Sequence, residues 1–217
     1  SNASSVSDVS DVSSQAVVSD TSEPETEPVI TSGNAIVVMS VETGQILLNT
    51  ANGREVDPTC ATKLMTAMLA FDMANGLDNQ VTVDAEALKN IGKKGDISAP
   101  MLGLRAGNTA TVRQLLQATL ISAANDACNA LAYSVSGGDI AGFVEKMNAR
   151  ATEIGCEHTY FTNTTGLYDG EAYTTVEDVA KIAAAFYRYN TLLDISSQPT
   201  YVIGGSTIHT KNYLRSE

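Results

Sequence analysis

The sequence has few basic residues for its length. Its 217 residues contain 13 Lys and Arg against 25 Asp and Glu, which gives a formal net charge of −12 at pH 7. Nucleic acids and anionic membrane surfaces are bound through basic residues, so this balance argues against both as partners. No run approaches the ~20 consecutive apolar residues that a membrane helix needs, so we also expect no membrane span.

Cysteine is scarce as well, with only Cys60, Cys128 and Cys156. Their odd number and their spacing match neither a Cys-x-x-Cys pair nor a set of zinc ligands, which argues against a disulfide framework and a zinc site. We therefore expect no metal and no cofactor. Cys156 follows Gly155 at the end of a predicted helix, and we expect its side chain to pack in the core.

The first 32 residues differ in composition from the rest. Residues 1–3, Ser-Asn-Ala, look like the remnant of a cleaved expression tag, so the natural N-terminus, with any signal or lipid anchor, would have been removed. Residues 4–32 have no aromatic residue, and the first thirty residues contain six acids but no Lys or Arg. Such a segment cannot bury enough apolar surface to offset the entropy cost of ordering. We predict a disordered acidic, Ser-rich linker over 4–32 and a folded domain over 33–217.

Strand and helix patterns alternate through this domain. Residues 35–41 and 45–49 are apolar runs around a Gly-containing turn, which predicts a hairpin whose first strand is buried on both sides. The segments 201–203 and 207–209 are also strand-like. Helical patterns start near Pro58 and Asp139, and two more start near Thr109 or Thr111 and near Thr174 or Thr175. We expect four aromatic side chains in the core: Phe186, Tyr187, Tyr201 and Tyr213.

The stretch 57–71 combines a helix start with reactive side chains. Pro58 suits a first helical turn because its fixed φ and missing N–H cost nothing there. Cys60 and Lys63 stand three residues apart, so on a helix they share one face. A nucleophile and its amine base require such a spacing. A buried structural cysteine followed by a solvent-directed lysine would give the same pattern, so the spacing alone does not decide.

Four further stretches carry specific local patterns: Thr62-Lys63-Leu64-Met65-Thr66, Asn125-Asp126-Ala127, Met147-Asn148, and Phe161-Thr162-Asn163 with Gly166-Leu167. With these stretches, residues 35–217 resemble the serine-type D-Ala-D-Ala carboxypeptidases, the low-molecular-weight penicillin-binding proteins of peptidase family S11. The resemblance implies an α/β (α+β) fold of the β-lactamase or transpeptidase-like type, in which a helical domain packs on an antiparallel sheet and the site lies at their junction.

The resemblance implies acyl transfer, but the chain departs from the family at each motif. Cys60 occupies the nucleophile position where the family has serine, and Lys63 matches the base. Asn125 matches the substrate-binding amide of a Ser-x-Asn motif, whereas Ala123 stands where that motif has its proton-relaying hydroxyl. Ser122 is one residue too early to replace it. The third motif, Lys-Thr-Gly, is absent, and residues 209–212 resemble the stretch that precedes it, so we expect the chain to stop before the later sheet strands.

Three functions follow from this resemblance. The first is an extracytoplasmic D-alanyl-D-alanine carboxypeptidase that acts on peptidoglycan stem peptides and takes β-lactam antibiotics as covalent ligands. The second is an impaired homologue that binds wall peptide or β-lactam without turnover, because loss of acid–base help costs roughly 10²- to 10⁴-fold. The third is an enzyme like the class A β-lactamases. Cys128 is either a core residue or a disulfide partner that would lock Cys60.

Overall fold

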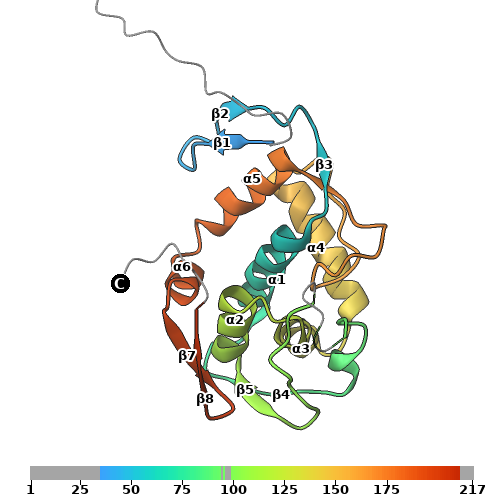
Figure 1. Ribbon diagram of the computed structural model, residues 1–217, viewed down its shortest axis with the longest axis vertical. Coiled ribbons are helices and arrows are strands. Elements are labelled where there is room, and N and C mark those ends of the chain that lie inside the picture. Colours follow the sequence, from blue (N-terminus) through green and yellow to red (C-terminus); the bar gives the residue numbers. More distant parts are fainter. Residues whose placement is uncertain (1–34, 94, 96–98, 211–217) are drawn as a thin grey trace, which may run out of the picture. The chain divides into compact units, whose positions relative to one another are not determined.

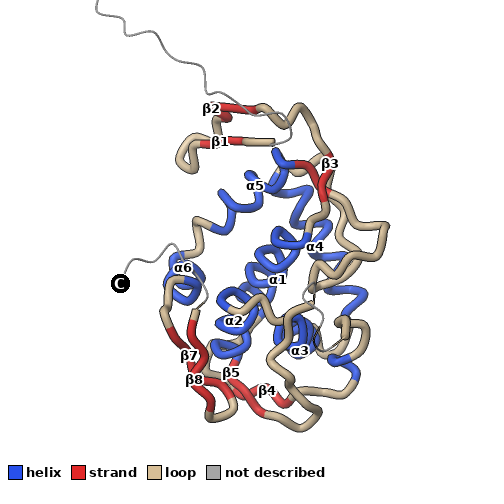
Figure 2. Tube along the Cα trace, viewed as in Figure 1, coloured by secondary structure: helices blue, strands red, loops and turns tan. Residues whose placement is uncertain are grey.

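The computed structural model describes residues 35–93, 95 and 99–210. The expected tag remnant at 1–3, the linker at 4–32 and Tyr213 lie outside the described residues. Within these residues, Figures 1 and 2 show a mixed domain whose helices gather around α1 (Thr59–Met73). None of the helices described is both long and apolar enough to cross a membrane.

Helix α1 forms the centre of the core because apolar or small residues occupy most of its circumference. It contacts four other helices: α2 (Val112–Ile121), α3 (Asn125–Val135), α4 (Ile140–Ile154) and α5 (Val176–Phe186). Met65, Ala67 and Ala70 are completely buried. A helix that is apolar on all sides is stable only when it is covered on all sides. The surrounding helices supply the large buried side chains Leu115, Leu116, Leu131, Phe143, Met147 and Ile182.

The other long helices begin and end at local signals in the sequence. At the start of α2 the Thr111 hydroxyl accepts the N–H of Gln114, whose side chain accepts the N–H of Thr111, so the two form a capping box. Asp139 and Thr175 cap α4 and α5 with their side chains. Helix α4 ends as predicted at Gly155, which has the left-handed φ of 87°.

The strands are short and pair antiparallel in four separate two-stranded ladders. The predicted hairpin at 35–49 is confirmed by β1 pairing with β2. The strand-like segments at 201–203 and 207–209 lie in β7 and β8, which pair with each other. A short helix, α6 (Asn190–Ser196), and a 3₁₀ turn, η1 (Glu86–Leu88), complete the elements described. The ladders are β1 (Val37–Met39) with β2 (Ile46–Asn49), β3 (Glu55–Val56) with β6 (Thr174–Thr175), β4 (Gln80–Thr82) with β5 (Thr109–Thr111), and β7 (Thr200–Ile203) with β8 (Ser206–His209).

Two of the burial predictions are wrong. Strand β1 is not buried on both sides, because it packs on α5 and leaves Val38 44% exposed. Tyr187 is 58% exposed whereas Phe186 is buried. Consecutive helical side chains point about 100° apart, so only one of this pair faces the core. Tyr201 is buried, as predicted.

Asp178, in the first turn of α5, connects this helix to the segment that follows α4. Its carboxylate accepts hydrogen bonds from the His158 N–H at 2.8 Å, the Thr159 hydroxyl at 2.9 Å and the Lys181 ammonium at 2.8 Å. Burial alone would raise the pKa of the Asp178 carboxyl, but these donors together hold it below its usual value. The carboxylate form therefore stabilises the fold.

We expect Asp178→Asn to lower the free energy of unfolding at pH 7 by about 2 kcal/mol. Because the folded-state pKa lies below the unfolded value of about 3.9, this contribution is complete above the unfolded pKa and is lost as the pH falls through the folded one. Urea unfolding across this range should show the difference between the two proteins shrinking below about pH 4. Asp139→Asn is the control, since Asn caps a helix as well as Asp. A difference that stays constant at low pH would contradict the assignment.

Candidate active site

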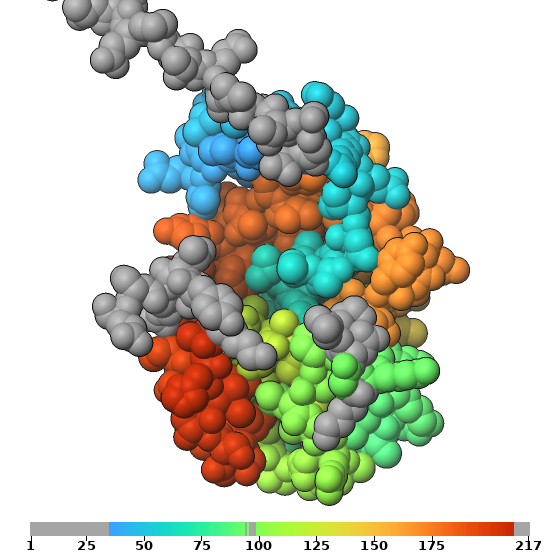
Figure 3. Space-filling model, in the orientation of Figure 1, coloured from blue at the N-terminus to red at the C-terminus, as the bar shows by residue number. Residues whose placement is uncertain are grey.

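The start of α1 brings Cys60 and Lys63 to one region of the surface. The helix begins directly after Pro58, whose carbonyl accepts the Thr62 N–H at 2.9 Å. Figure 3 shows this part of the chain, in turquoise, reaching the surface. Cys60 is exposed, whereas Lys63 is only 8% exposed. The lysine is therefore not directed into solvent, and it lies three residues after Cys60 on the same helix.

Two adjacent backbone carbonyls of the 162–167 loop hold the buried face of α1. The Lys63 amine donates a hydrogen bond to the Thr165 carbonyl. Thr66 donates from its hydroxyl to the Thr164 carbonyl at 2.7 Å, and the Cys128 thiol of α3 donates to the same oxygen at 3.0 Å. The loop thus fixes the position of the amine through main-chain atoms.

Burial shifts the pKa values of the Lys63 amine and of the Cys128 thiol. It lowers the pKa of the Lys63 amine below its usual value. More of the amine is then neutral at pH 7, which is the form a general base requires. Burial raises the pKa of the Cys128 thiol to about 11, so this thiol stays protonated and donates its hydrogen bond. Cys128 is a free, buried core residue and forms no disulfide with Cys60.

Asn163 stabilises the conformation of the 162–167 loop, and Gly166 allows the loop to approach the start of α1 closely. The Asn163 Oδ1 accepts the N–H groups of Thr165, Gly166 and Leu167 at 2.7 to 3.2 Å. Gly166 has a φ of 71°, and a Cβ there would lie 2.5 Å from the Thr59 carbonyl oxygen. A glycine is therefore required where the loop meets the start of α1.

The predicted helical pattern from Thr111 is broken between Ile121 and Asn125. Ala123 adopts a φ of 51°, a left-handed conformation that costs a non-glycine residue roughly 1 kcal/mol. Ser122 makes a 2.7 Å hydrogen bond with the Tyr201 hydroxyl. Both residues line a cavity of about 570 Å³ that also includes Pro100 and His209. Ala123 has no hydroxyl, so it contributes no polar side-chain group to this cavity.

Asn125, at the first position of α3, is 1% exposed and only partly satisfied. Its side-chain amide donates to the Ile91 carbonyl at 3.0 Å, and its N–H donates to the Pro100 carbonyl at 2.7 Å. Its Oδ1 is buried and has no hydrogen-bond partner among the residues described. A buried acceptor without a partner is costly. The Asn125 side chain is therefore only partly hydrogen-bonded within the part of the chain that the structure describes.

Asp126 is a structural residue of the site that the sequence reasoning did not identify. Its carboxylate accepts the consecutive N–H groups of Leu102, Gly103 and Leu104 at 2.7 to 3.1 Å. The segment that borders the 570 Å³ cavity is thereby attached to α3. An acid directly after a helix start was the only sequence signal for this role, and helix dipoles explain such acids equally well.

Gly166→Ala tests the contact between the loop and α1. We expect a loss of at least ~2 kcal/mol in the free energy of unfolding, because the new Cβ would overlap the Thr59 carbonyl in addition to the backbone strain. Gly155→Ala is the matched control: its φ is 87°, but no atom lies within 4 Å of the Cβ position. That variant should lose only about 1 kcal/mol. Equal losses in urea unfolding would show that the close approach is unimportant.

Comparison with protein sequences places these residues in a known context. A family model described as D-alanyl-D-alanine carboxypeptidase matches residues 20–214. The chain is similar to D-alanyl-D-alanine carboxypeptidase DacF of Bacillus subtilis, with 29% identity over 72% of this chain and 39% of that protein. It is similar to DacB2 of Mycobacterium tuberculosis at 29% identity over 76% of this chain and 54% of that protein. The chain spans about half the length of the curated relatives it matches.

Solved structures agree with this result. Penicillin binding protein 6B of Escherichia coli superposes with a TM-score of 0.76 at 27% identity, over 87% of this chain and 60% of that one. A mutant of the Streptomyces K15 DD-transpeptidase gives 0.74 at 27% identity, over 87% and 77%. Penicillin-binding protein D2 of Listeria monocytogenes, in an ampicillin-bound form, gives 0.69 at 25% identity, over 87% and 76%. The predicted transpeptidase-like fold class is confirmed.

Proposed function

Because the chain belongs to the D-alanyl-D-alanine carboxypeptidase family, peptidase S11, we propose that it cleaves terminal D-Ala-D-Ala bonds of peptidoglycan stem peptides by acyl transfer. The Cys60 sulfur attacks the carbonyl carbon of the penultimate D-alanine, and its proton passes to the Lys63 amine. Lys63 then gives this proton to the departing D-alanine nitrogen. Water hydrolyses the thioester, which releases the shortened peptide and restores the thiol.

The observation that carries this proposal is the environment of Lys63. Its amine is buried, has a lowered pKa and lies beside an exposed thiol on the same helical face. A lysine in solution is almost entirely protonated at pH 7 and accepts no proton, so a desolvated amine is the chemical feature that distinguishes a base from a surface cation. The fixed Thr165 carbonyl orients that amine.

Asn125 would bind the substrate in this mechanism. Its buried Oδ1 lacks a partner among the residues described, and a peptide N–H supplies the donor it needs. A β-lactam presents an acyl group and an amide of the same kind, and the ampicillin-bound form of the Listeria relative supports these drugs as covalent ligands here. We place the site of action outside the cytoplasm, where peptidoglycan lies.

The incomplete second motif favours an alternative function. Ala123 provides no hydroxyl to relay protons, and a sulfur at residue 60 is larger than the oxygen of the family. A chain with these residues that forms the acyl thioester but hydrolyses it slowly would hold wall peptide or β-lactam as a binding protein. The two functions share the first chemical step and differ in the second.

Intact mass spectrometry after incubation with benzylpenicillin tests the shared step. We expect a mass increase of one drug molecule, mapped to Cys60 and absent in Cys60→Ala. Lys63→Met should slow its formation by roughly 100-fold or more, because the base is lost. Cys156→Ala, which removes a buried thiol away from the site, is the control and should acylate normally. A folded protein that forms no adduct would reject acyl transfer at this site.

Turnover separates the remaining possibilities. Release of D-alanine from a D-Ala-D-Ala peptide at a rate above that of Cys60→Ala supports the carboxypeptidase. An adduct without release of D-alanine supports the binding homologue. Continuous hydrolysis of nitrocefin would instead favour an enzyme like the class A β-lactamases.

A further inference from the structure

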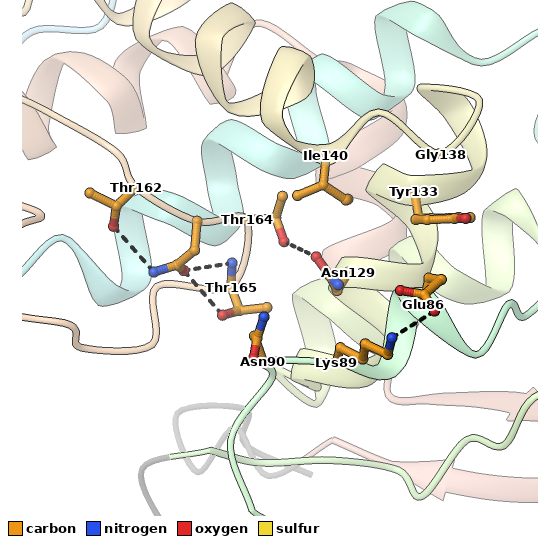
Figure 4. Close-up of a pocket in the computed structure, with 11 residues that line it drawn as sticks. Glu86, Lys89, Asn90, Asn129, Tyr133, Gly138, Ile140, Thr162, Thr164 and Thr165 are labelled. Atoms are coloured by element: carbon orange, nitrogen blue, oxygen red, sulfur yellow. Dashed lines mark hydrogen bonds and ion pairs between the residues drawn. The ribbon is translucent and has the colours of Figure 1, made fainter.

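The 162–167 loop, which accepts the hydrogen bond of Lys63, also borders a second cavity. No residue of α1 lines this cavity. This cavity has a volume of about 420 Å³ and is lined by η1, the end of α3, the start of α4 and residues 162–165. Figure 4 shows the Asn129 and Thr164 side chains pointing toward each other across its edge. On this side the loop borders open space, and its hydrogen bond with Asn129 is one of the contacts that hold it there.

Asn129 forms such a bond. Its Oδ1 accepts the Thr164 hydroxyl at 2.6 Å, and its Nδ2 donates to the Ala87 carbonyl at 2.8 Å. Asn129 is 8% exposed and Thr164 only 1% exposed. Both polar atoms of the Asn129 amide are therefore hydrogen-bonded. Because the site is buried, the loss of either partner would cost about 1 to 3 kcal/mol. Asn129 ties the loop to α3 and to the end of η1.

Thr164 transmits this restraint to the base. Its carbonyl accepts the Thr66 and Cys128 side chains, and the next carbonyl along the chain, that of Thr165, accepts the Lys63 amine. The Thr164 and Thr165 carbonyls belong to consecutive peptide units that meet at the Thr165 Cα. A displacement of the Thr164 backbone toward the cavity would therefore also move the Thr165 carbonyl, which is the acceptor of Lys63.

We propose that Asn129 is a positioning residue, which fixes the Thr165 carbonyl against the Lys63 amine through its hydrogen bond with the Thr164 hydroxyl. The inference rests on the proposed function, in which Lys63 is the base. Without this bond the loop would relax toward the cavity and water would reach the amine. Because burial is the main cause that lowers the pKa of Lys63, hydration would raise that pKa and reduce the neutral fraction at pH 7.

The titration of Lys63 provides a test that does not depend on activity. Its ¹³Cε NMR signal, assigned by its loss in Lys63→Met, should titrate at a higher pH in Asn129→Leu than in the unmodified chain. The matched control is Gln117→Leu, which removes another 8% exposed amide, on α2, that donates to the Gln198 side chain. That variant should leave the Lys63 titration unchanged even if it lowers stability to a similar extent.

A second pair of variants isolates the hydroxyl. Thr164→Val removes it at constant shape and should also move the Lys63 titration upward, whereas Thr164→Ser keeps it and should restore the original titration. This pair decides the question if Asn129→Leu does not fold. An unchanged Lys63 titration in folded Thr164→Val or Asn129→Leu would overturn the proposal.

Acylation by benzylpenicillin links the positioning role to the chemistry. In Thr164→Val the acid limb of the pH profile for acylation should move to higher pH, with a rate about tenfold lower at pH 7. Two results together would reject the proposed function and leave the positioning role standing. They are the absence of an adduct on the unmodified chain and a shifted Lys63 titration in Thr164→Val. Acylation that slows equally at all pH values would indicate a purely structural effect and count against the role.

Discussion

The burial of the Lys63 amine on a backbone carbonyl is the constraint on which the rest of the site depends. An uncompensated ammonium in a protein interior is costly, so the fold must either supply acceptors or let the group lose its proton. Here the fold does both, with the Thr165 carbonyl as acceptor and a lowered pKa. Helix α1 can carry a buried lysine in its first turns because the 162–167 loop supplies the acceptor for its amine.

The parts of the fold that depend on local chemistry could be predicted from the sequence. The caps at Thr111 and Thr175 and the left-handed end at Gly155 are set by residues within one turn of the helix end. The two hairpins follow from apolar runs that flank short turns. Burial on one or both sides is a property of the neighbours, which explains why the exposures of Val38 and Tyr187 differ from the expectation.

The partners of the candidate base could not be predicted in this way. Lys63 and Thr165 are separated by 102 positions in the sequence, and a backbone carbonyl has no residue type by which to recognise it. Ala123 was identified from the family pattern as a missing hydroxyl, but its left-handed backbone is invisible in an alanine. Asn125 and Asn129 lie one helical turn apart. This spacing was the only sign in the sequence that α3 forms two hydrogen bonds with the 87–91 segment.

The hydrogen bonds that Asp126 accepts from three consecutive N–H groups restrict the relative motion of two parts of the site. The 102–104 segment and the Asn125 amide are attached to the same first turn of α3, so they cannot move apart without breaking charge-assisted hydrogen bonds. A guest molecule that touches both would meet a single preformed surface. Little conformational entropy would then be lost at this surface when the molecule binds. The residues on the other side of the bound molecule would have to adapt to differences between one bound molecule and another.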